Sequence, residues 1–149
     1  MKLFFACIFF YTNIFLQAQN IKIGIFPDLK FREINLTLIG KYYISIDSLN
    51  NYLGINGQSF IVSAVDDTLI SLIQSNFDTL LNKIKSIQFK AIDNDSKLKI
   101  NFKSFNINDF LFYGNFYFRT DSGFIKIINE VDIDRYVAGV VEAEAGFKG

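Results

Sequence analysis

An alternation of apolar and polar side chains, with a period of two residues, recurs along most of the chain and favours β-strands. Turn-forming residues separate the alternating segments, and we expect the stretch 50–57 (NNYLGING) to be turn-rich. Asp121 to Gly123 predict a tight turn that closes a hairpin. The pattern thus predicts a meander of strands and hairpins. The strands are expected at residues 21–26, 34–38, 43–46, 97–102 and 124–128, with further β-like runs at 60–65 and 112–119.

The stretch 69–87 fits two patterns at once. Several of its apolar residues, among them Phe77, Leu81 and Ile84, follow helical spacing, whereas residues 84–91 alternate as a strand would. Periodicity alone leaves helix and strand open here.

The period changes to that of a helix at Asp132, which is a suitable N-cap, and Gly146 is suitably placed to end the helix. Between them the apolar residues stand at i, i+3, i+4, i+7 and i+8, and we expect this stripe to be the buried face of an amphipathic helix. The stripe consists of Ile133, Tyr136, Val137, Val140 and Val141. Together with the strands, the helix predicts an α+β fold that is mainly β.

Composition argues against several classes of function. The 15 basic and 15 acidic residues balance and form no run of like charge, so no nucleic-acid partner is expected. Histidine is absent, which excludes a Ser-His-Asp triad, a Cys-His pair and every His-containing metal site in this chain. Asp66 and Asp67 lack further ligands and are interpreted as turn residues, as are Gly54 and Gly57. We expect no metal and no cofactor.

The first residues have the pattern of an export signal. A basic residue precedes the apolar stretch 3–16, and we expect cleavage after Ala18, with an uncleaved anchor as the alternative. Cys7 lies in this segment, so the mature chain would contain no thiol. We therefore expect a signal peptide at 1–18, one domain at 19–149, and a location in the periplasm, the cell envelope or outside the cell.

Two carboxylates near the end of the predicted helix differ in position. With about 100° per residue, Glu144 lies about 20° from Ile133, near the middle of the apolar stripe, whereas Glu142 lies about 180° away. Burial and the negative end of the helix dipole should both raise the pKa of Glu144. A partly neutral carboxyl group of this kind suits a general acid that protonates a glycosidic oxygen. The structural alternative is a frayed or salt-bridged helix terminus.

A run of motifs extends from residue 113 to residue 146. It consists of Tyr113-Gly114, an apolar strand that ends in Asn129-Glu130-Val131, and the segment DIDRYVAGVVEAEAG. In order and spacing, these resemble the aromatic-x-Gly strand, the Val-Asn-Glu-Val strand end, the Leu-Glu-x-Tyr-Leu helix entry and the Gly-Val-Val-x-x-Glu turn of the bacterial stage II sporulation protein D / amidase-enhancer (SpoIID/LytB) family. The rest of the chain carries no signature of the family.

The resemblance implies a protein that acts on peptidoglycan. Family members that are lytic transglycosylases cleave denuded glycan strands between MurNAc and GlcNAc, and the Glu of the Gly-Val-Val-x-x-Glu motif, here Glu144, is their catalytic acid. One carboxyl group suffices because the 6-hydroxyl of the sugar closes a 1,6-anhydro ring. Tyr136 and Glu130 are further candidates for contact with the substrate. The implied partners are glycan strands and a cell-wall amidase.

The family's next helix, with its Lys-x-Gln-Ala and Arg-Thr-Tyr-Ala motifs, would follow the last residue, Gly149. We therefore expect an incomplete or inactive lytic transglycosylase, with a non-catalytic wall-binding or amidase-enhancing module as the alternative. In the family that helix completes the cleft, and without it the sugar would not be held in the geometry that the reaction needs. A misplacement of about 1 Å can already slow a reaction roughly a hundredfold.

Overall fold

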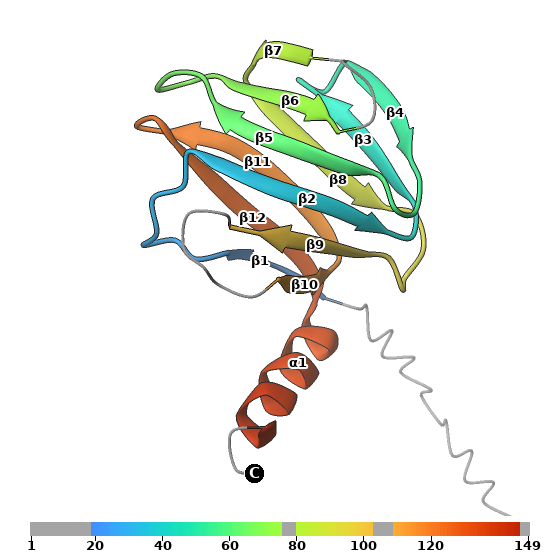
Figure 1. Cartoon of the computed structure of the whole chain (residues 1–149). Coiled ribbons are helices and arrows are strands. Elements are labelled where there is room, and N and C mark those ends of the chain that lie inside the picture. Colours follow the sequence, from blue (N-terminus) through green and yellow to red (C-terminus); the bar gives the residue numbers. More distant parts are fainter. Residues whose placement is uncertain (1–18, 76–79, 103–108, 147–149) are drawn as a thin grey trace, which may run out of the picture.

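The computed structural model describes residues 19–75, 80–102 and 109–146, without the side chains of Asn50, Leu80 and residues 142–146. These ranges form twelve strands and one helix (Figure 1), which confirms the predicted α+β, mainly β class. The predicted export signal, residues 1–18, lies outside them. In the part of the chain that is described, no helix is long and apolar enough to cross a membrane.

The strands form two six-stranded antiparallel sheets that pack face to face (Figure 1). In spatial order, the first sheet contains β1 (Asn20–Gly24), β12 (Phe124–Asp132), β11 (Asn115–Asp121), β8 (Ser86–Ala91), β3 (Tyr42–Ile46) and β4 (Asn50–Gly54). The second sheet contains β10 (Phe110–Tyr113), β9 (Lys97–Asn101), β2 (Glu33–Ile39), β5 (Ser59–Ala64), β6 (Ile70–Gln74) and β7 (Leu80–Ile84). The helix α1 (Ile133–Gly146) follows β12 directly and projects from the sandwich (Figure 1).

The core lies between the two sheets and is built by the alternation seen in the sequence. In β2, Ile34, Leu36 and Leu38 are buried, and the residues between them are not. In β11 of the facing sheet, Phe116 and Phe118 are buried in the same way. Burial of a side chain of this size stabilises the fold by about 1.5–3 kcal/mol, so the shared inner face holds the two sheets together.

The two open sides of the sandwich differ. Where β1 and β10 form the edges, aromatic rings fill the gap: the ring centroid of Phe102 lies 4.3 Å from that of Phe31 and 5.4 Å from that of Phe26. The ring centroid of Phe110 lies 5.0 Å from that of Phe26. At the opposite side, where β4 and β7 form the edges, the sheets enclose a pocket between them.

Two connections pass from one sheet to the other at a glycine. Gly40 joins β2 to β3 with φ at 97°, and Gly114 joins β10 to β11 with φ at 96°. A side chain at either position would meet neighbouring atoms, since a Cβ would lie 2.5 Å from the hydroxyl oxygen of Ser96 or 2.3 Å from the carbonyl oxygen of Glu130. The left-handed backbone and the lack of space both require glycine here.

Three sequence expectations change. The stretch 69–87, which periodicity left open, contains strands β6 and β7, separated by residues outside the description. The run 112–119, expected as one β-like segment, is two strands of different sheets that meet at Gly114. The prediction of a turn-rich stretch at 50–57 is wrong for its first half, because Asn50–Gly54 forms the edge strand β4. Pairing with β3 overrides the weak strand propensity of Asn and Gly.

Other local predictions are confirmed. Ser122 and Gly123, with φ at 52° and 79°, form the two-residue loop of the β11–β12 hairpin. A carboxylate oxygen of Asp66 accepts hydrogen bonds from the N–H groups of Thr68 and Leu69, both at 2.8 Å, as expected of a turn residue. Gly57, with φ at 85°, lies in a turn as predicted, whereas Gly54 is part of β4.

Candidate functional site at the base of the helix

The Gly114 corner brings the motif residues of β10 and β12 together. Asn129, which is buried, donates hydrogen bonds from its side-chain nitrogen to the carbonyl oxygens of Tyr113 at 2.8 Å and Asn115 at 3.1 Å. The carbonyl of Glu130 packs directly against Gly114. Tyr113-Gly114 and Asn129-Glu130, about 15 residues apart in sequence, thus form one structural unit at the end of the sandwich.

The first turn of α1 sits on this unit. One carboxylate oxygen of Asp132 accepts hydrogen bonds from the N–H groups of Asp134 at 3.0 Å and Arg135 at 3.2 Å, which confirms the predicted N-cap. The guanidinium group of Arg135 lies 5.1 Å from the ring centroid of Tyr113 and donates a hydrogen bond to the carbonyl oxygen of Asn94. The helix is thereby tied to the sandwich at its N-terminal end.

Two hollows flank the contact between Tyr113 and Arg135, and both residues line each of them. The first hollow, of about 200 Å³, is polar and includes Glu130 and Asp132. The second is an apolar groove of about 290 Å³ between β10 and α1 that includes Leu111 and Tyr136, among others. The two predicted substrate contacts thus line neighbouring hollows, Glu130 the first and Tyr136 the second.

Glu130 is held by a tyrosine of the neighbouring strand. The hydroxyl group of Tyr117 donates a hydrogen bond of 2.7 Å to a carboxylate oxygen of Glu130. Burial, followed by this hydrogen bond and the negative charge of Glu130, raises the pKa of Tyr117 to about 12. Glu130 thus lines the polar hollow with a carboxylate that can accept a hydrogen bond from a ligand hydroxyl.

Tyr113 and Tyr136 differ in what they offer to a ligand. Two cations lie over the ring of Tyr113, the ammonium of Lys97 at 4.6 Å and the guanidinium of Arg135 at 5.1 Å. Tyr136 is 42% exposed and borders the groove. Of the two rings, Tyr136 is therefore the better platform for stacking.

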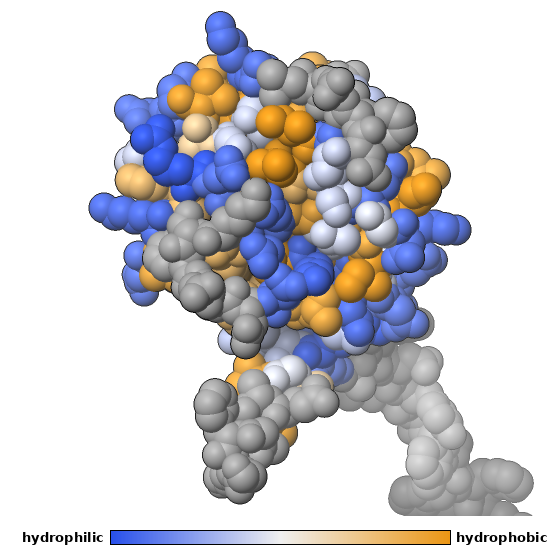
Figure 2. All heavy atoms as spheres, viewed as in Figure 1, coloured by the Kyte–Doolittle hydropathy of each residue, from blue (hydrophilic) through white to orange (hydrophobic). Residues whose placement is uncertain are grey.

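The expectation of a buried helical stripe is wrong for the residues described. Tyr136, Val137 and Val141 are 42%, 51% and 59% exposed, and Ile133 and Val140 are exposed as well. The reason is that α1 extends away from the sandwich (Figure 1), so that β10 and β12 cover this face of the helix only in part. Figure 2 shows apolar residues at the surface of the helix stem as well as on the sandwich.

Glu144 lies within α1, as the periodicity predicted, and so does Glu142. Both side chains are outside the described part of the chain, so their predicted difference in environment stays a prediction. Since the stripe is exposed from Ile133 to Val141, burial against the described residues does not extend toward Glu144. The predicted rise of its pKa would then need another surface to cover the stripe.

Sequence reasoning missed Arg135 and its partners Asn94 and Asp95. Asp95 forms an ion pair of 3.6 Å with the guanidinium group. One signal was present: a cation in the first turn opposes the helix dipole, so its presence suggested a tertiary partner. The position of that partner, 40 residues earlier in the chain, becomes evident only in the folded structure.

Among the described residues, no three acidic, His or Cys side chains lie close enough together to hold a metal ion. No protein-family model, curated protein or solved structure matches this chain. What the site does is therefore inferred from its own residues and from the motif resemblance.

Proposed function

We propose that this protein binds the glycan strands of peptidoglycan at the base of α1. The observation that supports this most directly is that motif residues from Tyr113-Gly114, Asn129-Glu130 and the first two turns of α1 line a polar hollow and an apolar groove at one place. Sugar rings have apolar C–H faces and polar hydroxyl edges. A groove bordered by Tyr136 beside a hollow containing Glu130 and Arg135 matches both kinds of surface.

We further propose that Glu144 is the acid if the strand is cleaved, as in the lytic transglycosylases that the motifs resemble. Glu144 belongs to the same helix as Tyr136, two turns further from the sandwich. A ligand that covers the apolar stripe would desolvate this part of the helix and so raise the pKa of the carboxyl group. Binding is the better supported part of the proposal, because the described residues form the groove but do not enclose the stripe.

Binding is tested with purified peptidoglycan from which the stem peptides have been removed. The full chain should co-sediment with this material, and Tyr136→Ala should weaken binding by roughly three- to tenfold through loss of ring contact. Tyr43→Ala is the matched control, because Tyr43 is 52% exposed on the outer face of β3, away from the helix. Equal weakening in both variants, or no binding by the unchanged chain, would contradict the proposal.

Cleavage is tested separately by the release of glycan fragments that end in 1,6-anhydro-MurNAc from the same glycan. If the chain is active, Glu144→Gln should abolish release and Glu142→Gln should leave it unchanged. If release persists in Glu144→Gln, Glu144 is not the acid. Binding without release would favour the alternative, a non-catalytic wall-binding or amidase-enhancing module, which the addition of a cell-wall amidase would then test.

Export by the segment 1–18 to the periplasm, the cell envelope or the exterior is part of the same proposal, since peptidoglycan lies there. Fusion of residues 1–18 to a reporter that is active only outside the cytoplasm tests it.

A further inference from the structure

The pocket between edge strands β4 and β7 lies at the opposite side of the sandwich from β1 and β10, below which α1 projects (Figure 1). Its volume is about 190 Å³. Apolar cavities of about 150 Å³ take up one benzene molecule, so the space suits a single six-membered ring. The pocket is therefore a second cavity, separate from the hollows at the base of the helix.

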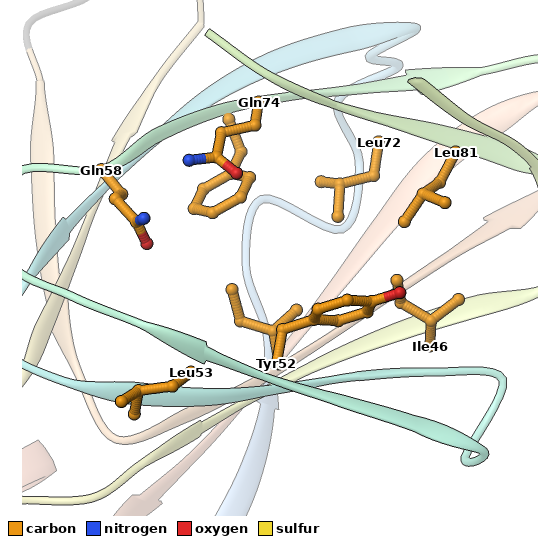
Figure 3. A pocket seen from close by; sticks show the side chains of 9 residues that line it. Ile46, Tyr52, Leu53, Gln58, Leu72, Gln74 and Leu81 are labelled. Atoms are coloured by element: carbon orange, nitrogen blue, oxygen red, sulfur yellow. The ribbon is translucent and has the colours of Figure 1, made fainter. Parts of the chain in front are cut away.

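The inner face of the edge strand β4 contributes an aromatic ring to the pocket. Tyr52 pairs with the buried Ile44, and directly paired residues face the same side of a sheet, so Tyr52 points inward. Gly54, the next inward position, is covered by Leu38, since a Cβ there would lie 2.5 Å from it. The ring of Tyr52 lies along the pocket and is 48% exposed (Figure 3).

Polar groups gather at one end of the pocket. Gln74 projects into it from β6, and Gln58 from the connection just before β5, across from Tyr52 (Figure 3). The side-chain oxygen of Gln58 accepts a hydrogen bond from the N–H of Ile55 at 3.0 Å, which leaves its amide hydrogens for another partner. Within the described residues, the side chain of Gln74 has no hydrogen bond to protein atoms. The pocket thus offers amide donors and an acceptor that a ligand can satisfy.

The other end of the pocket is lined by Ile46, Leu72 and Leu81, and the hydroxyl group of Tyr52 points toward this end (Figure 3). No charged side chain lines the pocket among the residues described. A charged ligand would lose hydration without gaining a partner. An all-aliphatic ligand would leave the two amide groups and the hydroxyl group of Tyr52 unpaired. The lining therefore favours a neutral ligand that combines apolar surface with more than one hydrogen-bonding group.

We propose that this pocket binds one acetamido sugar of the N-acetylglucosamine type. The apolar face of the sugar ring would lie against Tyr52, the acetamide methyl group toward Leu72 and Leu81, and the hydroxyl or amide groups toward Gln58 and Gln74. The choice of an acetamido sugar among neutral amphiphilic rings rests on the proposed binding of glycan. The pocket would give the protein a second contact with the wall, at the end of the sandwich away from α1.

The full chain is titrated with N-acetylglucosamine, glucose and cyclohexanol while amide NMR signals of β4 and β6 are followed. Saturable shifts are expected with N-acetylglucosamine, weaker ones with glucose, and weaker ones again with cyclohexanol. Tyr52→Ala should weaken sugar binding roughly tenfold. Tyr43→Ala, a change of the same kind on the outer face of the neighbouring strand, should leave it unchanged.

Three results would overturn the inference: no saturable shift with the sugar, cyclohexanol binding as tightly as the sugar, or equal losses in the two tyrosine variants. Gln74→Leu gives a second measurement, because it should reverse the preference between sugar and cyclohexanol without removing the ring contact. Tyr136→Ala separates this inference from the proposed function: it should leave the monosaccharide shifts intact while it weakens binding to whole glycan.

Discussion

Two of the connections between the sheets turn at a glycine, Gly40 or Gly114, and each of these corners is secured by a buried polar side chain. The hydroxyl group of Ser96 accepts a hydrogen bond from the N–H of Lys41, next to Gly40, and donates one to the carbonyl of Lys41. The side chain of Asn129 bonds the carbonyl groups on both sides of Gly114. In both corners a backbone with positive φ would otherwise leave buried polar groups unsatisfied. The motif residues Gly114 and Asn129 thus have a structural role that is independent of any ligand.

Gly114→Ala should destabilise the protein more than Gly57→Ala. Both glycines have positive φ, which costs an alanine about 1 kcal/mol. A Cβ at Gly57 would meet no atom within 4 Å, whereas one at Gly114 would lie 2.3 Å from a backbone oxygen. The clash should add roughly 1–3 kcal/mol of strain. Urea denaturation of the two variants measures the difference, and equal free energies of unfolding would show that the corner can relax.

The stability of the protein should fall as the pH rises from about 10 to about 12. The pKa of Tyr117 is raised from 10.0 to about 12 in the folded chain, so the folded state favours the neutral phenol. The resulting stabilisation is fully present below the ordinary pKa and is lost as the pH rises through the raised one. Denaturation at several pH values should show a shallower decline for Tyr117→Phe. The pKa of Tyr42 is raised by burial in both proteins, so the difference between them isolates Tyr117.

At the scale of elements, the alternation identified strands where a strand has one buried and one exposed face. It failed at β4, where Asn and Gly suggested a turn, and it could not distinguish β10 from β11. In both cases the decisive contribution is pairing with a distant strand, β3 for β4 and β9 for β10. The sequence predicted the helix because its period, its cap and its end agree. It did not predict that the helix is exposed, because periodicity reveals an apolar face but not what covers that face.

Asp132→Ala should loosen the start of α1. The variant loses the acceptor for two N–H groups of the first turn, which costs about 1 kcal/mol and should speed amide hydrogen exchange there roughly fivefold. Asp132→Asn keeps an acceptor oxygen and should stay close to the original rate. If both variants exchange alike, the contacts of Arg135, and not the cap, hold the helix base.

At the scale of the whole molecule, the sandwich is closed on one side and open on the other. Aromatic rings of Phe26, Phe31, Phe102 and Phe110 fill the side at β1 and β10. The side at β4 and β7 contains the pocket with the half-exposed Tyr52. We therefore expect side chains at the side near α1 to contribute more to stability than those at the pocket.

Phe102→Ala should lower the free energy of unfolding by about 3–5 kcal/mol, because Phe102 is fully buried among other rings. Tyr52→Ala should lower it by less than about 1 kcal/mol, since the ring is half exposed at an edge. Thermal or urea unfolding of both variants makes the comparison. Similar losses would mean that the pocket side is packed as firmly as the aromatic side.

Local sequence patterns were enough to predict the mainly β class, the β11–β12 hairpin, and the cap and span of the helix, because these depend on spacings within a few residues. The folded chain was needed to learn that the strands form two facing sheets, that Arg135 meets Asn94, and that the helical stripe is exposed. Pairing, burial and ion contacts join residues far apart in the chain, and no local pattern records which distant surface a face will meet.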